Sequence, residues 1–322
     1  MKIKLLHICQ EINFMRKRQL AILAAFIATS IYGITFTIAK DVMPLHIKPF
    51  GFILLRVAIT ASLFWIVASL FFKSEPIERK DFLRIFGAAV FGVAINMLSF
   101  FKGLSYTTPI NAAVIMATAP IMVFVFSIFL LKEKIILRRI IGILLGLTGT
   151  VFLILYGHKS SIEGSNIMLG NTLVFINATS YSFYLIIVKK LLDKYHPFTF
   201  VKWVYLIGVL LVLPFGFNEL SEVSWSSLTF DIWWKIGFII VLSTFITYLF
   251  NLFALSKLKP TTVGIFIYLQ PVIASIYALY VGSDSLNTVK IIATICIFIG
   301  IYLVSASFKK TEFHKINIPI KK

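Results

Sequence analysis

Long apolar stretches alternate with short charged segments along this chain, and the pattern predicts membrane-spanning helices. A helix needs about 20 apolar residues to cross a hydrocarbon layer of about 30 Å. Apolar windows of that length, bounded by charge, predict ten helices, at residues 20–39, 50–72, 83–101, 110–131, 138–156, 169–188, 199–217, 235–255, 261–281 and 289–308. Because the windows are continuously apolar, they exclude a transmembrane barrel and predict an all-α integral membrane protein.

Composition and charge agree with this class of protein. The chain of 322 residues is 59% hydrophobic and 14% charged, which is more apolar surface than one soluble core can bury. Its net charge of +18 comes from short clusters between the windows, which is typical of cytoplasmic loops and not of nucleic-acid binding. With the amino terminus inside, 23 Lys and Arg residues fall on the inner side and five on the outer side. The sequence therefore predicts a multi-pass protein of the cell (inner) membrane, surrounded by membrane lipids, with both termini cytoplasmic.

The chain also repeats itself at an offset of about 150 residues. Pro109 and Pro120 recur as Pro260 and Pro271, and the Ala-Thr-Ser tripeptide that begins at Ala28 recurs 150 residues later. Five helices in each copy is an odd number, so the second copy must enter the membrane from the opposite side. The sequence thus predicts two inverted five-helix repeats around a central cavity, the architecture of alternating-access carriers.

The repeats divide the chain into five parts. The predicted boundaries are a cytoplasmic tail at residues 1–19, a first repeat at 20–156, an extracytoplasmic connecting loop at 157–168, a second repeat at 169–308 and a basic cytoplasmic tail at 309–322. The apolar run after the basic cluster at 16–18 is too long for a signal peptide, so we expect an uncleaved first span. Met15 directly precedes that cluster, and both Met1 and Met15 stay open as the native start.

Several motifs occur in an order that resembles a known family. In chain order they are Tyr32-Gly33, Lys40, Pro49-Phe50, Arg56, Gly103-Leu104-Ser105-Tyr106-Thr107, Pro120, Glu133, Gly142 and Gly149, with the later ones repeated between Leu255 and Gly300. Together they are similar to an EamA-type member of the drug/metabolite transporter superfamily. The resemblance implies ten helices, cytoplasmic termini, and solute export or uptake through a central cavity. One departure is Asp284 at the second acidic position, where that family usually has Glu.

Polar side chains inside the apolar windows are the candidates for a solute site. Thr244, Thr247, Tyr248 and Asn251 stand at i, i+3, i+4 and i+7 and form one stripe. An unsatisfied amide or hydroxyl is costly in lipid, so the stripe faces either a wet cavity or hydrogen bonds to other helices. The other cavity candidates are Tyr32, Thr35, Asn96, Ser99, Asn111, Thr118, Asn177, Tyr181, Tyr184, Tyr268 and Gln270. A ring of neutral hydroxyls, amides and aromatic faces suits a neutral, zwitterionic or amphipathic solute.

One charge and four prolines also lie within the windows. Arg56 is about two turns into the second window and must snorkel, pair or serve a site, and we favour snorkelling toward the headgroups. Pro109, Pro120, Pro260 and Pro271 remove helix hydrogen bonds at matched places, so they are candidates for hinges or for static kinks.

Small and acidic residues around the fifth window predict structural contacts. Gly142, Gly146 and Gly149 make this helix thin on one side, which permits close packing of another helix. We expect that contact within a monomer, and a homodimer stays open. Glu133, just before the window, is expected to cap the fifth helix or to pair with Arg138 or Arg139.

These features favour secondary transport. We expect the chain to move a small organic solute, such as an amino acid, a related metabolite or an amphipathic drug-like compound, by alternating access, in the export direction. The alternative is a membrane-embedded enzyme, or a lipid- or solute-handling protein without transport activity. An enzyme would need a nucleophile, metal ligands or an acid/base pair, but the five histidines are scattered and the two cysteines lie far apart. We therefore expect no catalytic residue, metal or cofactor, and the coupling ion stays open.

Overall fold

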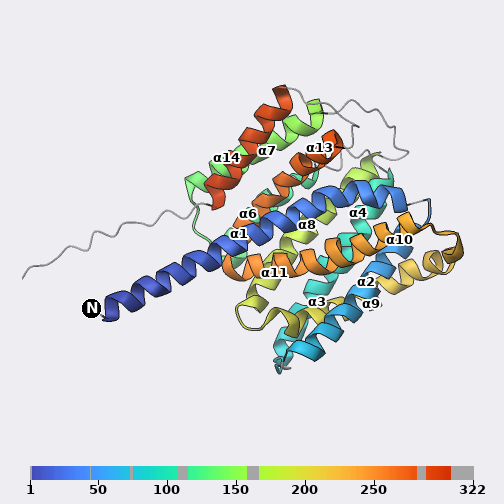
Figure 1. The fold of residues 1–322 in the computed structure, drawn as a ribbon, viewed down its shortest axis with the longest axis horizontal. Coiled ribbons are helices and arrows are strands. Elements are labelled where there is room, and N and C mark those ends of the chain that lie inside the picture. Colours follow the sequence, from blue (N-terminus) through green and yellow to red (C-terminus); the bar gives the residue numbers. More distant parts are fainter. Residues whose placement is uncertain are drawn as a thin grey trace, which may run out of the picture.

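The computed structural model describes residues 2–43, 45–72, 75–106, 115–157, 167–280 and 288–305, and every regular element within them is a helix (Figure 1). The first half contains α1 (Lys2–Val42), α2 (Pro49–Phe71), α3 (Arg79–Ala89), η1 (Val90–Ala94), α4 (Ile95–Tyr106), α6 (Ala119–Leu131) and α7 (Leu137–Gly157). The second half contains α8 (Ile167–Leu192), α9 (Pro197–Ser221), η2 (Trp225–Ser227), α10 (Phe230–Gly237), η3 (Phe238–Ile246), α11 (Thr247–Lys257), α12 (Pro260–Gly264), η4 (Ile265–Leu269), α13 (Gln270–Tyr280) and α14 (Thr288–Ser305). The first helix begins at Lys2 and so includes most of the predicted amino-terminal tail.

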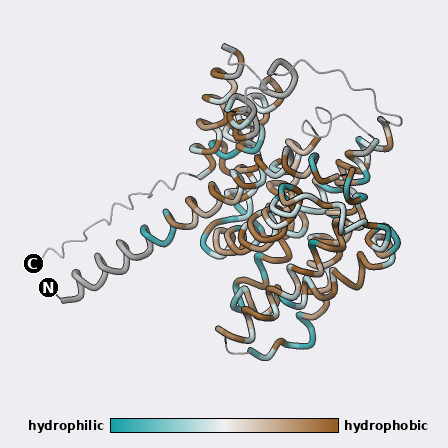
Figure 2. The backbone as a smooth tube through the Cα atoms, turned by 45° about the vertical axis from the view of Figure 1, so that its right-hand side comes forward, coloured by the Kyte–Doolittle hydropathy of each residue, from teal (hydrophilic) through white to brown (hydrophobic). Residues whose placement is uncertain are grey.

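Helix length and composition fit a membrane. Six helical stretches of the described residues are long and apolar enough to cross one: Arg16–Thr35, Pro49–Phe71, Arg79–Leu104, Met168–Leu192, Pro197–Ser221 and Phe230–Lys257. Three shorter apolar helices are Ala119–Leu131, Pro260–Ile273 and Ile291–Ser305. Large apolar side chains such as Leu70 and Phe129 are exposed, and apolar residues colour most of the helical tube in Figure 2. Since so large an exposed apolar surface is stable in lipid and not in water, this is a multi-pass membrane protein.

Helices from the two halves pack against each other in pairs. α1 packs against α11, α4 against α8, α2 against α9, α6 against α12 and α7 against α14. Figure 1 shows α7 and α14 side by side at one end of the molecule and α2 and α9 at the other, with α1 and α11 between them. The main hydrophobic core contains buried residues from both halves, and Phe64, Tyr205 and Tyr268 are among its largest fully buried side chains.

Glycines permit the close contact between α7 and α14. A Cβ on Gly300 would stand 2.6 Å from the carbonyl oxygen of Gly142 and 2.8 Å from the backbone nitrogen of Gly146. A Cβ on Gly149 would stand 2.7 Å from the carbonyl oxygen of Ala293. Real Cβ atoms do not approach backbone that closely, so these positions require a residue without a side chain. The prediction that the glycine face of the fifth helix packs within the monomer is confirmed.

Two membrane-spanning helices change their winding at matching positions. η1 is a π-helical turn between α3 and α4, and η3 is a longer one between α10 and α11. Residues 90–94 of η1, shifted by the 151 residues that separate Pro109 from Pro260, fall at 241–245 within η3. The hydroxyls of Thr244 and Thr247 each donate a 2.7 Å hydrogen bond to the carbonyl oxygen five residues earlier. Because π-helical turns are frequent at functional sites, these two direct attention to the middle of the bundle.

The repeated prolines lie where helices start. Pro260 is the first residue of α12 and Pro120 lies in the first turn of α6, where a missing N–H breaks no helix hydrogen bond. Pro271 is the second residue of α13 and follows the 3₁₀ turn η4. Pro109 lies outside the described residues. The chain is therefore irregular just before Pro120 and Pro271, whereas Pro260 interrupts no helix.

Polar contacts join the start of α2 to the end of α9. Lys48 pairs with Glu222, and a carboxylate oxygen of Glu219 accepts hydrogen bonds of 2.7 and 3.0 Å from the first two N–H groups after Pro49. Lys235 Nζ lies 2.9 Å from a carboxylate oxygen of Asp41, which links the end of α1 to α10. All these segments are predicted to lie on the outer side of the membrane.

A second set of polar contacts joins segments that the sequence places on the inner side. Asp81 has a fully buried side chain and accepts a 2.8 Å hydrogen bond from Lys194, the residue that follows α8 by two positions. This hydrogen bond raises the pKa of the Lys194 ammonium. Glu133 lies 2.6 Å from an Arg139 guanidinium nitrogen, which confirms the predicted pairing ahead of the fifth helix.

Candidate functional site

Arg56 of α2 turns into the helix bundle. The residue is 7% exposed, and its Nε donates a 3.2 Å hydrogen bond to Oγ1 of Thr244 in η3. The guanidinium carbon lies 6.0 Å from the ring centroid of Phe52 and 5.6 Å from that of Phe101, within the range of a cation–π attraction. The prediction that Arg56 snorkels toward the headgroups is therefore wrong, because a hydroxyl and two aromatic faces stabilise the cation inside the protein.

Further polar side chains surround the guanidinium. Tyr32 of α1 and Tyr205 of α9 lie within electrostatic reach of Arg56, and Tyr32 also faces the side chain of Asn251 in α11. Thr60, one turn after Arg56, and Tyr205 are fully buried, and their hydroxyl oxygens have no hydrogen-bond partner in the described part of the chain. We define the Arg56 site as Arg56, Tyr32, Tyr205, Thr244 and Asn251. Helices of both halves thus bring a cation, an amide and hydroxyls to one buried place.

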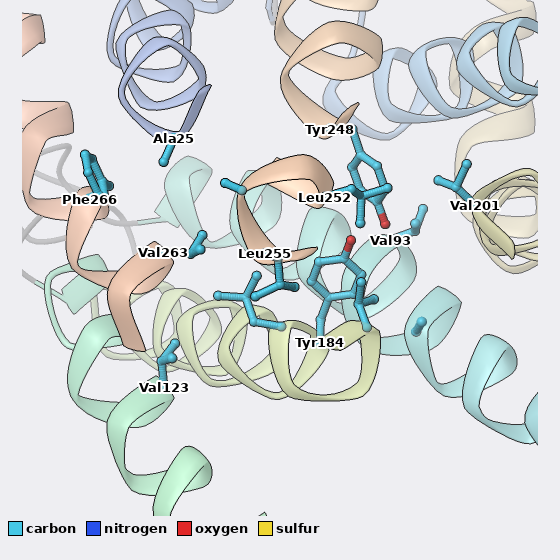
Figure 3. Close-up of a cluster of buried hydrophobic side chains, with 14 of the residues drawn as sticks. Ala25, Val93, Val123, Tyr184, Val201, Tyr248, Leu252, Leu255, Val263 and Phe266 are labelled. Atoms are coloured by element: carbon cyan, nitrogen blue, oxygen red, sulfur yellow. The ribbon is translucent and has the colours of Figure 1, made fainter. Parts of the chain in front are cut away.

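An aromatic cluster adjoins the Arg56 site. The Tyr205 ring centroid lies 4.9 Å from that of Tyr248 and 4.9 Å from that of Phe64, and Phe64 lies 4.7 Å from Phe245. Tyr184 of α8 lies 5.9 Å from Tyr248, and Figure 3 shows the hydroxyls of these two tyrosines pointing toward each other. Rings at such separations attract one another, so the cluster ties α2, α8, α9 and α11 together at the centre.

Three members of this centre, Tyr205, Phe64 and Phe245, are not among the candidates that the sequence supplies. Tyr205 lies well inside the seventh apolar window, as Tyr181 and Tyr184 do in the sixth, so the same criterion identifies it. Phe64 carries no sequence signal that separates it from the other 31 phenylalanines of the chain. Its importance comes from its neighbours, which only the folded chain supplies.

Several predicted cavity residues instead satisfy backbone groups. The Asn177 side-chain amide donates a 2.7 Å hydrogen bond to the carbonyl oxygen of Asn96, which joins α8 to α4. The hydroxyls of Thr35 and Thr118 donate to carbonyl oxygens four and three residues earlier, at 2.7 and 2.6 Å. These side chains therefore shape the helices around the centre, as Thr247 does at the start of α11.

The other predicted residues lie apart from the Arg56 site. Tyr268 is fully buried, and its ring packs against α7 so closely that a Cβ on Gly146 would overlap it. The Tyr181 ring centroid lies 6.1 Å from that of Tyr184, at the edge of the aromatic cluster. Ser99 and Gln270 are half-buried, and Asn111 lies outside the described residues.

An open cleft of about 370 Å³ lies between α2 and α9. Its lining residues are Ala58, Ala61, Ser62, Trp65, Leu206 and Val209. The indole N–H of Trp65 donates to the carbonyl oxygen of Lys202 at 3.2 Å, which leaves the lining mostly apolar. The cleft contains none of the predicted cavity residues, so it differs from the polar cavity expected from the sequence.

The chain resembles known proteins in both sequence and fold. The model of the EamA-like transporter family matches residues 19–155 and again residues 168–306. An uncharacterized transporter of Archaeoglobus fulgidus is 25% identical over 278 residues, which cover 86% of this chain and 96% of that protein. The uncharacterized transporter YetK of Bacillus subtilis is 25% identical over 236 residues, or 73% of this chain and 72% of YetK. A protein crystal structure that is 17% identical superposes with a TM-score of 0.71, over 88% of this chain and 98% of that one. This chain belongs to the EamA-like transporter family.

Proposed function

We propose that this protein is a secondary transporter that exports a small organic solute across the cell membrane by alternating access. The observation that carries the proposal is the Arg56 site, where a buried cation, an amide and hydroxyls from both halves of the chain converge. Ionisable and polar groups are costly inside a membrane protein and mark solute or ion pathways. The family and the transporters among its relatives support the same function.

The helix pairs support ten spans in two inverted halves. If the halves are exchanged, the first helix takes the place of the sixth, and the third takes the place of the eighth. The α1–α11 pair then becomes the α8–α4 pair, while α2–α9 and α7–α14 each map onto themselves. The π-helical turns η1 and η3 obey the same exchange. A two-fold axis in the membrane plane would produce this reciprocity.

Contacts at the helix ends support the proposal that both termini lie on the same side of the membrane. The Arg18 guanidinium, at the start of the first span, donates a hydrogen bond to the carbonyl oxygen of Ser305 in α14. If the chain crosses the membrane an even number of times between Arg18 and Ser305, both residues lie on the same face of the membrane. The Asp81–Lys194 pair joins only segments that the charge count places inside, and the contacts at the start of α2 join only outer segments. We therefore propose cytoplasmic termini in the inner membrane.

Alternating access requires a closed centre and helices that can bend. Arg56, Thr244 and Tyr205 are at most 7% exposed, so these members of the Arg56 site are buried in this conformation, whereas Tyr32 and Asn251 are half-buried. The π-helical turns and the irregular segments before Pro120 and Pro271 are places where a helix can change direction with little loss of hydrogen bonding. We propose these four places as hinges.

Reconstitution of the purified chain into liposomes tests this function. Amino acids, related metabolites and cationic amphipathic drugs are offered as solutes, with and without a pH gradient, and uptake is measured. Tyr248→Ala and Asn251→Ala are expected to lower uptake at least tenfold because they remove polar and aromatic surface from the centre. Tyr302→Ala, on a residue of α14 that is 62% exposed, is the matched control and should transport normally.

The outcomes separate transport from the alternatives. Unchanged uptake in both central variants would remove the eighth helix from the solute pathway. An absence of uptake by the wild type, together with chemical turnover of a lipid or solute, would favour a membrane-embedded enzyme.

A further inference from the structure

The positive charge of Arg56 is not neutralised by any described carboxylate. The nine described carboxylates all make contacts elsewhere, and they are Asp41, Glu75, Glu78, Asp81, Glu133, Asp193, Glu219, Glu222 and Asp231. The other four acidic residues fall in the predicted tails and loops, and they are Glu11, Glu163, Asp284 and Glu312. Buried arginines are normally paired, since an uncompensated charge away from water is strongly destabilising.

The geometry of Arg56 leaves its terminal nitrogens available. Its Nε is occupied by Thr244, and among the described residues no hydrogen bond is made by the two terminal nitrogens. These nitrogens form a planar fork that matches the two oxygens of a carboxylate. The buried hydroxyls of Thr60 and Tyr205, also without partners in the described chain, can donate to an anion held there.

We propose that the Arg56 site binds a carboxylate group of the transported solute. This inference rests on the proposed function and narrows its substrate to small organic acids and zwitterions that carry one carboxylate. The carboxylate oxygens accept hydrogen bonds from the guanidinium fork, and the Tyr205 hydroxyl donates to the same group. The adjoining aromatic cluster of Phe64, Tyr184 and Tyr248 packs against the apolar part of the solute.

A single cation favours a carboxylate over a phosphate dianion. Lys235 and Arg139 are paired with carboxylates, and Lys202 lies 4.8 Å from the ring centroid of Trp65, on the α2–α9 side of the bundle. Recognition of a doubly charged phosphate calls for several converging Arg or Lys side chains. Of these cations, Arg56 alone lies at the centre without a carboxylate, so the group that it binds should carry a charge close to −1.

Paired solutes that differ only in having a carboxylate or a neutral carboxamide test the proposal. Liposomes with the full chain are offered L-amino acids and 2-hydroxy acids, each beside its primary carboxamide. The wild type should take up carboxylates at least about tenfold faster than amides, because a charge-assisted hydrogen bond contributes about that factor. Arg56→Gln should lose this preference, because its carboxylate uptake should slow about tenfold more than its amide uptake. Arg56→Lys should keep a weaker preference, since an ammonium lacks the fork.

Lys202→Gln is the control for the loss of a cation from a span, and it should keep the wild-type ratio. Equal uptake of carboxylates and amides by the wild type, or a wild-type ratio in Arg56→Gln, would overturn the proposal. If Arg56→Gln does not fold, a ratio in Arg56→Lys at or above the wild-type ratio would overturn it. Wild-type uptake restricted to cationic drugs would overturn this inference and leave transport standing, whereas no uptake of any solute would refute transport itself.

Discussion

Replacing Gly300 with Ala tests the close packing of α14 on α7. The new Cβ would stand 2.6 Å from the carbonyl oxygen of Gly142, 2.8 Å from the nitrogen of Gly146 and 3.1 Å from its Cα. All three are backbone atoms, so no side-chain rotation can relieve the overlap. Ordinary contact begins at 3.4 Å, and 3.4 − 2.6 = 0.8 Å is the separation that the two helices must gain.

That separation weakens the whole α7–α14 contact. Dispersion falls steeply with distance, and overpacked substitutions destabilise proteins by about 1–3 kcal/mol. The gain in helix propensity from Gly to Ala, at most about 1 kcal/mol, offsets part of this loss. We therefore expect Gly300→Ala to lower the free energy of unfolding by about 1–2 kcal/mol.

Gly237 supplies the matched control. A Cβ there meets nothing within 4 Å, so Gly237→Ala should be neutral or slightly stabilising. Both variants and the wild type are unfolded thermally in one detergent, with helix content and monodispersity as readouts. A Gly300→Ala protein as stable as Gly237→Ala would show that the two helices are not held this closely.

Three further predictions concern other contacts. Asp81→Asn and Lys194→Gln should each lower the melting temperature. In a double-mutant cycle, the double variant should lose less stability than the sum of the two single losses, and fully additive losses would contradict the pairing. Glu219→Ala removes the acceptor for two N–H groups of α2, so it should destabilise by about 1 kcal/mol in thermal unfolding, and an unchanged midpoint would argue against the cap. Gly92→Ala should displace the Tyr184 ring and slow liposome uptake, whereas Gly87→Ala, whose Cβ would stand 3.5 Å from its nearest neighbour, should not.

The sequence predicted much of the fold because lipid imposes a simple rule on length and polarity. The second window, residues 50–72, matches α2 (Pro49–Phe71) within one residue. The glycines of the fifth window and the Glu133–Arg139 pair were also predicted, since each depends on local spacing and a general packing or charge rule.

The site was harder to predict because its contacts are distant in sequence. The direction of the Arg56 side chain depends on Phe101 and Thr244, which lie on helices far along the chain. The polar stripe of the eighth helix is predicted from α-helical spacing, but η3 is π-helical. The hydroxyls of Thr244 in η3 and of Thr247, the first residue of α11, donate to carbonyl oxygens five residues earlier. No residue pattern in the apolar window indicates that change of winding.

The proposed transport depends on two five-helix halves inserted in opposite directions, and cysteine accessibility tests this arrangement most directly. In a chain whose two native cysteines are serine, single cysteines are placed at Leu45, Lys80, Lys190 and Ser226, which are all exposed. Intact cells are treated with a membrane-impermeant maleimide before and after lysis. We predict labelling of Leu45→Cys and Ser226→Cys in intact cells, and of Lys80→Cys and Lys190→Cys only after lysis. Labelling of the equivalent loops at Leu45 and Lys190 from the same side would contradict the inverted arrangement.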